Sequence, residues 1–219
     1  MKEIINISQV SLGYKDKELL KVNFKIYKGD FCIISGNNAT GKSLLLKLLY
    51  MKILPKKGNI FLFGKKIDEK SKNQILDYRK NIGVILHDDT LIPFFTVYQN
   101  IELSSEIQNS KKDFLKRINE ILNWLDLTKI KNSYINQLSS GERQKVSIAR
   151  ALINNPQIIL ADEPTGSLDF QTAKEIFKLI KNQINSERII IFATHNRFFA
   201  NKSDCLLEMI NGNIKSIND

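Results

Sequence analysis

The 219-residue chain is 42% hydrophobic and 26% charged, a globular composition that excludes intrinsic disorder and allows a substantial core. No apolar run approaches the ~20 residues needed to cross a bilayer, which excludes a membrane-spanning helix. The net charge of +10 suits a nucleic acid, the anionic face of a membrane, or a lysine-rich solvated surface, and charge alone leaves these possibilities open.

The two cysteines and the first residues bear on where the protein resides. Cys32 falls in an apolar run and Cys205 in a late apolar stretch, so two buried thiols are expected rather than a bridge. The N-terminal residues lack the uninterrupted apolar core of a signal peptide. We therefore expect a cytoplasmic protein.

The N-terminal half predicts short strands and helices around one glycine-bounded loop. Alternating apolar and polar residues predict half-buried antiparallel strands at 2–10 and 22–27. The apolar run 31–34 predicts a buried strand directly before the loop. Beyond the loop, the pattern predicts in turn a helix, a strand, a helix and a buried strand, at 44–49, 59–63, 74–80 and 82–86.

The segment 96–131 has a different character, with apolar residues at helical spacing between lysines and acids. We expect one domain spanning 1–219, in which a helical subdomain of about 96–145 is inserted into an α/β core. The C-terminal part predicts buried strands, an amphipathic helix and a hairpin turning at Asn211-Gly212, in the order 158–161, 171–185, 189–193 and 206–217.

The loop between the strand 31–34 and its helix matches the phosphate-loop pattern G-x-x-x-x-G-K-S. Its residues are Gly36, Asn37, Asn38, Ala39, Thr40, Gly41, Lys42 and Ser43. Backbone N–H groups in such a turn, together with the positive end of a helix, surround anionic phosphates. A chance glycine turn is the competing interpretation, but strand, loop and helix all agree with the motif. A nucleotide site is predicted, with Lys42 on the terminal phosphates and Ser43 on Mg²⁺.

A second group of polar residues ends the buried strand 158–161. Asp162 and Glu163 follow it directly, at the strand edge where open α/β sheets bind ligands. An isolated acid pair is often a solvated strand end. Beside a phosphate loop, Asp162 is predicted to act on Mg²⁺ and Glu163 to polarise the attacking water.

A third element is a serine turn before a helical run. Its residues are Ser139, Ser140, Gly141 and Glu142. A hydroxyl and free N–H groups at a helix start form an anion site, although a plain helix cap is the simpler alternative. One nucleotide rarely needs two such sites from one subunit. A two-fold dimer, in which each serine turn closes over the partner's nucleotide, resolves this.

In this order, the phosphate loop, LSSGERQ, LADEPTGSLD and ATH resemble the motifs of ATP-binding-cassette (ABC) ATPases, and the resemblance covers essentially the whole chain. It implies an α/β core of P-loop type with an antiparallel β subdomain and a helical subdomain, binding ATP and Mg²⁺. It also implies that Tyr14 stacks on adenine, that His195 contacts the γ-phosphate, and that Asp169 lies in the loop linking the two subunits' sites. In isolation, Tyr14 would be a strand-end aromatic and His195 a polar residue after a strand.

The sequence departs from the family pattern at four places. His87 stands where the family usually has a glutamine that contacts the nucleotide and Mg²⁺. We expect His87 to take over this contact, and a histidine can titrate near neutrality. Asn38-Ala39 replaces a Ser-Gly pair, which adds a Cβ where glycine's freedom is often used. Leu44 replaces a threonine near the α-phosphate, and Ser140 replaces the second signature glycine. An active ATPase is still expected, with Lys42, Glu163 and His195 as its catalytic residues, and the departures suggest slow hydrolysis.

Within the family, the segments 41–50 and 95–101 most resemble the FtsE group of cell-division ATPases. These pair with the membrane subunit FtsX, so we expect an ATP-dependent homodimer, peripheral on the inner face of a bacterial plasma membrane. The membrane subunit is expected to dock near 87–100, where Pro93, Phe94 and Phe95 form either an apolar patch or subdomain core. Lipoprotein-release or macrolide-type export remains the alternative. A cassette acting on DNA or ribosomes, or one that binds without catalysis, is not favoured, and no nucleic acid is expected.

Overall fold

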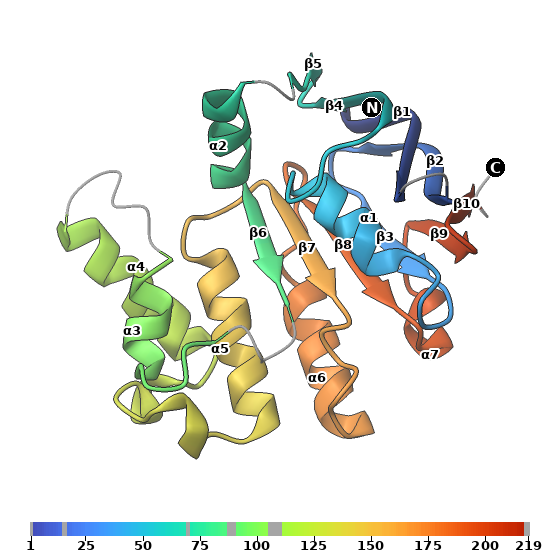
Figure 1. Ribbon diagram of the computed structural model, residues 1–219. Coiled ribbons are helices and arrows are strands. Elements are labelled where there is room, and N and C mark those ends of the chain that lie inside the picture. Colours follow the sequence, from blue (N-terminus) through green and yellow to red (C-terminus); the bar gives the residue numbers. More distant parts are fainter. Residues whose placement is uncertain (1, 15–16, 69–70, 87–90, 105–110, 217–219) are drawn as a thin grey trace.

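The computed structural model describes residues 2–14, 17–68, 71–86, 91–104 and 111–216. Over these residues the strands join in one curled sheet with the order β5-β4-β1-β2-β10-β9-β3-β8-β7-β6 (Figure 1). The strands are β1 (Glu3–Tyr14), β2 (Lys17–Tyr27), β3 (Phe31–Ser35), β4 (Lys57–Leu62), β5 (Lys65–Lys66), β6 (Ile82–Ile85), β7 (Ile158–Asp162), β8 (Ile189–Thr194), β9 (Cys205–Ile210) and β10 (Asn213–Ser216).

Helices occupy both sides of the parallel strands and the segment between β6 and β7. They are α1 (Lys42–Leu49), α2 (Lys72–Lys80), α3 (Val97–Glu102), α4 (Lys111–Trp124), α5 (Ser140–Leu152), α6 (Phe170–Lys181) and α7 (Arg197–Ala200), with short 3-10 turns η2 (Thr128–Ile130) and η3 (Ile135–Gln137). Figure 1 shows α3 and α4 gathered beside α5, away from α1.

The parallel part of the sheet, β9-β3-β8-β7-β6, separates two apolar cores. Side chains alternate along β3 because successive residues of a strand point to opposite faces. Phe31 and Ile33 enter the core covered by α3 to α7, whereas Cys32 and Ile34 enter the core shared by α1 and the antiparallel strands. A strand buried on both faces reads as a continuous apolar run, which is why the sequence predicted β3, β7 and β8 well.

The antiparallel part extends further than the sequence pattern indicated. β1 and β2 pair from Glu3↔Tyr27 to Tyr14↔Lys17, through register shifts that interrupt the simple alternation. These irregularities hide residues 11–14 from a period-two pattern. The predicted antiparallel arrangement is confirmed, with longer strands.

The C-terminal hairpin joins the two parts of the sheet. β9 and β10 pair with Asn213↔Ile210 across the predicted two-residue turn, where Asn211 and Gly212 both have positive φ (47° and 79°). β9 runs parallel to β3, and β10 meets β2 at Asn213↔Lys21. The hairpin prediction is confirmed, and its place between the two parts depends on contacts that no local pattern encodes.

The helix predicted at 171–185 ends earlier. α6 stops at Lys181 because the chain turns at Asn185, whose side-chain oxygen accepts hydrogen bonds from the N–H groups of Glu187 and Arg188 at 2.9 Å each. Asparagine favours such turns over helix interiors. This shorter helix leaves room for the turn into β8.

Candidate nucleotide site

The loop between β3 and α1 has the shape that the motif predicted. Gly36 has φ of 157°, and a Cβ there would lie 2.6 Å from the Met209 carbonyl oxygen, which explains the need for glycine. The Thr40 hydroxyl donates to the Asn37 carbonyl at 2.9 Å and closes the turn. A cavity of ≈ 570 Å³ lies over the loop, lined by Leu19, Asn38, Ala39, Thr40, Gly41, Lys42, Ser43, Leu44, Glu163, Asn211 and Gly212.

Lys42 is buried at the start of α1, with 5% of its surface exposed. Its ammonium donates to the carbonyl oxygens of Gly36 (2.8 Å) and Asn37 (2.9 Å). The same nitrogen lies 3.2 Å from Oε1 of Glu163, which accepts no hydrogen bond there. The lysine therefore connects the loop to the acid pair at the end of β7.

The first acid of the pair, Asp162, faces Ser43. The serine hydroxyl donates to Oδ1 of Asp162 at 3.0 Å, which joins α1 to β7. Burial raises the pKa of Asp162 above its ordinary value and the Glu163 charge adds to the rise, against the Ser43 hydrogen bond and the charges of Lys47 and Lys42. The raised pKa means that the Ser43 hydrogen bond and the two lysines do not fully offset the cost of burying the Asp162 charge.

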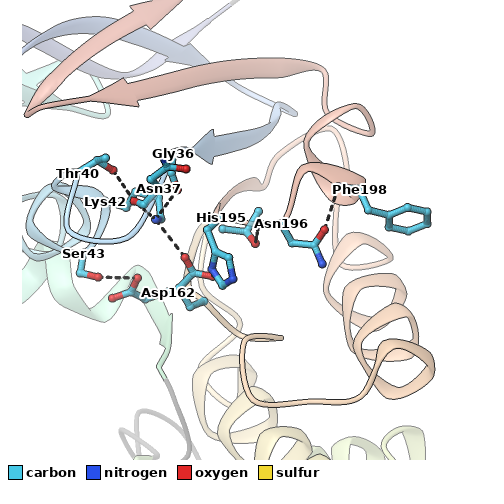
Figure 2. Close-up of polar contacts among 11 residues, drawn as sticks. Gly36, Asn37, Thr40, Lys42, Ser43, Asp162, His195, Asn196 and Phe198 are labelled. Carbon is cyan, nitrogen blue, oxygen red and sulfur yellow. Dashed lines mark hydrogen bonds and ion pairs between the residues drawn. The ribbon is translucent and has the colours of Figure 1, made fainter.

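The second acid, Glu163, occupies a strained backbone position with φ of 46°. Its N–H donates to the Ala193 carbonyl at 3.0 Å, which fixes this turn against β8. Oε2 lies 3.0 Å from Nδ1 of His195, the residue after β8. Figure 2 shows Lys42, Ser43, Asp162 and His195 converging from α1 and the ends of β7 and β8.

The donor set fits Mg-ATP. A hydroxyl and a carboxylate suit Mg²⁺, which keeps several water and phosphate oxygens as its other ligands. Within the described ranges no cluster of three or more His, Cys, Asp or Glu side chains could hold a metal by protein ligands alone. The glycine-shaped loop and the buried Lys42 ammonium supply the complementary groups for phosphates.

The serine turn begins α5, and its polar groups bond to one another. Ser139 caps the helix: its hydroxyl accepts from the Glu142 N–H (3.3 Å), and Glu142 Oε2 accepts from the Ser139 N–H (2.8 Å) and hydroxyl (2.7 Å). These bonds hold the pKa of Glu142 below its ordinary value. The local geometry is that of a capping box, the simpler alternative for this segment.

Asp169 caps α6 beside this turn. Its carboxylate accepts from the N–H groups of Gln171 and Thr172 and from the Thr172 hydroxyl, chiefly the last, which lowers its pKa. A Cβ on Gly141 would lie 2.9 Å from the Thr172 methyl group, so α5 and α6 begin close together. Figure 1 shows this corner well separated from the loop before α1.

Two predicted contacts lie outside what the structure describes. His87 falls in the gap 87–90. The backbone of Tyr14 ends β1, and its side chain is not among those described. The roles predicted for both residues stay predictions.

Asn100 organises the segment after β6, and the sequence interpretation missed it. Its side chain is fully buried: Oδ1 accepts from the Ile92 N–H (2.8 Å), and Nδ2 faces the carbonyl oxygens of Ile92 (3.1 Å), Thr96 (3.1 Å) and Phe95 (3.4 Å). The resulting turn leaves Phe94 74% exposed, with its ring edge-on to Phe95. The available signal was an asparagine beside Ile101, within the short helical segment that starts at Val97.

The comparisons with known proteins agree with this geometry. The model of the ABC transporter family matches residues 19–166. The chain belongs to the ABC transporter family. It is an ATP-binding cassette and an ATPase of that family. Such cassettes bind ATP with Mg²⁺, form ATP-bound dimers and work with membrane subunits. Within the described part of this cassette, no helix is both long and apolar enough to cross a bilayer.

Relatives of different roles resemble the cassette to similar degrees. The cell division ATP-binding protein FtsE of Bacillus subtilis is 34% identical over 203 residues, covering 90% of this chain and 88% of its own. The lipoprotein-releasing system ATP-binding protein LolD of Buchnera aphidicola is 39% identical over 210 residues, covering 92% and 91%. The solved ATP-binding cassette MJ0796, a post-hydrolysis dimer bound to ADP and Pi, superposes with a TM-score of 0.85 at 30% identity, covering 97% of each chain.

Proposed function

We propose that this cassette hydrolyses ATP through the contact chain Lys42–Glu163–His195, with Ser43 and Asp162 holding Mg²⁺. The observation that carries the proposal is the convergence of these side chains from three elements, with Glu163 between the lysine and the histidine. When bound, Mg²⁺ neutralises charge on the phosphates. The serine turn and Asp169 act on the nucleotide of a second copy, and Tyr14 and His87 complete each site.

The position of Glu163 indicates how the residues act on the substrate. Its Oε1 is 3.2 Å from the Lys42 ammonium and accepts no hydrogen bond. A phosphate that takes over Lys42 leaves Oε1 available to accept a proton from water, while His195 holds Oε2 in place. Glu163 thus serves as general base and His195 as the group that orients it and contacts the γ-phosphate.

The test is Glu163→Gln, which keeps the side-chain shape but removes the base. We expect phosphate release to fall by at least about 100-fold, the usual contribution of a general base, with ATP binding retained and the dimer trapped. Phosphate release and size-exclusion chromatography with ATP measure the two effects. Turnover near that of the unaltered protein would exclude this role for Glu163.

For the physiological role, we place the cassette with an FtsX-like membrane subunit, coupling dimer closure to septal cell-wall hydrolase activation. The support is the FtsE-like segment 95–101 and the exposed Phe94 held out by the buried Asn100. The helical subdomain, about 96–145, follows directly on Phe94 within one domain, 1–219. The cassette then lies on the inner face of the plasma membrane. Lipoprotein release is the second candidate, supported by the 39% identity to LolD.

Trapping the complex in cells distinguishes the two roles. Glu163→Gln is expressed, the complex is extracted in detergent, and the co-purifying membrane subunit is identified. Recovery of an FtsX-like subunit, with filamentous cells on depletion, supports division, and a lipoprotein-release permease supports the second candidate. Adding Phe94→Ser should abolish recovery, whereas Leu76→Ser, which alters a 53% exposed residue on α2, should not.

Slow hydrolysis is the remaining part of the proposal. Ala39 has φ of 60°, a conformation that costs an L-residue roughly 1–2 kcal/mol, and Leu44 packs toward the apolar core instead of offering a hydroxyl. Turnover below that of typical enzymes, whose median kcat is about 10 s⁻¹, is the expected outcome, and a steady-state assay of the purified dimer measures it.

A further inference from the structure

The two cysteines, 173 positions apart, meet directly across adjacent parallel strands. Cys32 in β3 and Cys205 in β9 are paired in register, and both are free thiols. Their sulfur atoms lie 2.9 Å apart. The two side chains point to the same face of the sheet, beneath α1. Two thiols in such contact need little movement to reach the ~2.05 Å of a disulfide bond.

The two thiols differ in exposure. Cys32 is fully buried and Cys205 is half-buried, so a reagent from solvent reaches Cys205 first. The hydrogen bond with Cys32 lowers the pKa of Cys205 against burial and the charges of Asp30 and Asp204, whereas burial raises the pKa of Cys32. Cys205 is therefore the attacking thiol and Cys32 the resolving one.

The same strand pair supports the nucleotide loop. β3 leads into Gly36, whose missing Cβ leaves room for the Met209 carbonyl of β9. The Gly212 N–H, in the turn after β9, donates to the Thr40 carbonyl at 2.9 Å. A shift of β9 against β3 therefore moves atoms that contact the loop at both of its ends.

We propose that Cys32 and Cys205 are a site of reversible oxidation, closing an intramolecular disulfide that weakens ATP binding at the adjacent loop. The oxidant is a small disulfide such as oxidised glutathione. Cys205 loses its proton to solvent and attacks one sulfur of the small disulfide; a mixed disulfide forms, and one small thiolate leaves and takes up a proton. Cys32 then loses its proton and attacks the Cys205 sulfur, which releases the second small thiol. Two protein thiols are oxidised and one small disulfide is reduced to two thiols.

The bond itself is tested on the full chain in glutathione buffers of graded ratio, quenched with acid and analysed by intact mass after alkylation. The expected product has lost two hydrogen atoms and takes up no alkylating agent. Cys205→Ser should remain unreacted because Cys32 is buried, and Cys32→Ala should stop as a glutathione adduct on Cys205. Two results for the unaltered protein would overturn the proposal. One is a stable glutathione adduct on Cys205, and the other is two free thiols in the most oxidising buffer.

The effect on ATP rests on the nucleotide site proposed above, whereas bond formation does not, so the two parts fail separately. We expect oxidised protein to bind ATP about fivefold more weakly than reduced protein, the low end of coupling between linked sites. Cys205→Ser, measured in the same buffers, should show no difference. Equal dissociation constants for the oxidised and reduced unaltered protein would refute the coupling even where the disulfide forms.

Discussion

The phosphate corner, where the loop before α1 meets the ends of β7 and β8, contrasts with the signature corner, where α5 and α6 begin. At the phosphate corner, side chains reach across elements, as in Ser43–Asp162 and Lys42–Glu163, and Ala39 and Glu163 have positive φ. At the signature corner, Ser139 and Asp169 cap their own helices from ordinary extended conformations. The first corner is a strained assembly built for a ligand, and the second is relaxed within one chain. This difference supports the proposal that the second corner acts on the nucleotide of another copy.

The largest effect is expected from mixing two inactive variants, one altered at each corner. Lys42→Ala and Ser139→Arg should each lower ATP hydrolysis by about 100-fold or more, as loss of a preorganised phosphate contact does. Mixed, they should recover about a quarter of the unaltered activity, because half of the dimers are heterodimers with one intact composite site. A phosphate-release assay on the mixture measures the recovery.

The matched control mixes Lys42→Ala with Glu163→Gln. Both changes lie in the phosphate corner, so every site of the heterodimer keeps one defect and no activity should return. Recovery in this control, or none in the first mixture, would mean that the two corners do not act across a dimer.

A smaller effect is expected from two isosteric changes with opposite signs. Glu142→Gln keeps the capping-box pattern but removes its charge, and it should destabilise the fold by about 0.5 kcal/mol at neutral pH because Glu142 is partly exposed to solvent. Because its pKa is lowered in the folded state, ionised Glu142 stabilises the protein at pH values above its ordinary pKa. This stabilisation is lost as the pH falls through the lowered pKa, so the deficit of the variant should vanish in acid.

Asp162→Asn should instead stabilise the fold by about 1 kcal/mol, as replacing a residue kept for function often does. Burial raises the pKa of Asp162, so its ionisation costs stability above the raised pKa, and the cost disappears as the pH falls below the ordinary value. Urea unfolding of both variants between neutral pH and pH about 2, below the ordinary carboxyl pKa values, tests the signs and their disappearance in acid. Equal signs for the two variants would contradict the contrast between strained and relaxed corners.

A similarly small effect concerns backbone strain alone. Ala39→Gly should stabilise the fold by about 0.5 kcal/mol, because glycine adopts the φ of 60° freely but loses more backbone entropy on folding. Gly64→Ala is the mirror control: its φ is 75° and a Cβ there meets nothing within 4 Å, so a loss of similar size is expected. Thermal unfolding measures both changes. No gain from Ala39→Gly beside a clear loss from Gly64→Ala would show that the loop relaxes its own strain.

Local patterns predicted most of the fold and the polar groups of the phosphate corner. The buried strands and their terminal acids were predicted because apolar runs and turn residues are encoded over a few positions, as in 158–163. The ABC ATPase class is confirmed by the family match and the solved cassette. The capping box at Ser139 agrees with the simpler alternative, and its role across a dimer stays a prediction.

Long-range contacts limited the rest. The link between β2 and β10 rests on Asn213↔Lys21, nearly 200 positions apart, which no periodicity reveals. The side-chain amide of Asn100 makes four hydrogen bonds because the preceding turn folds back onto Asn100. The positive φ of Glu163 occurs where its N–H donates to Ala193 in a neighbouring strand. Such positions are specified by tertiary context and not by the residue's own propensity.

The backbone of Gly212 connects two distant parts of the molecule. Its carbonyl accepts from the Lys21 N–H at 2.7 Å, its N–H donates to the Thr40 carbonyl at 2.9 Å, and a Cβ there would lie 2.3 Å from the Leu19 carbonyl. The two peptide planes that meet at the Gly212 Cα therefore connect β2 to the loop over the phosphate cavity. Tilting the antiparallel strands would move Thr40, so a force applied to that edge of the molecule would reach the nucleotide loop through the backbone alone.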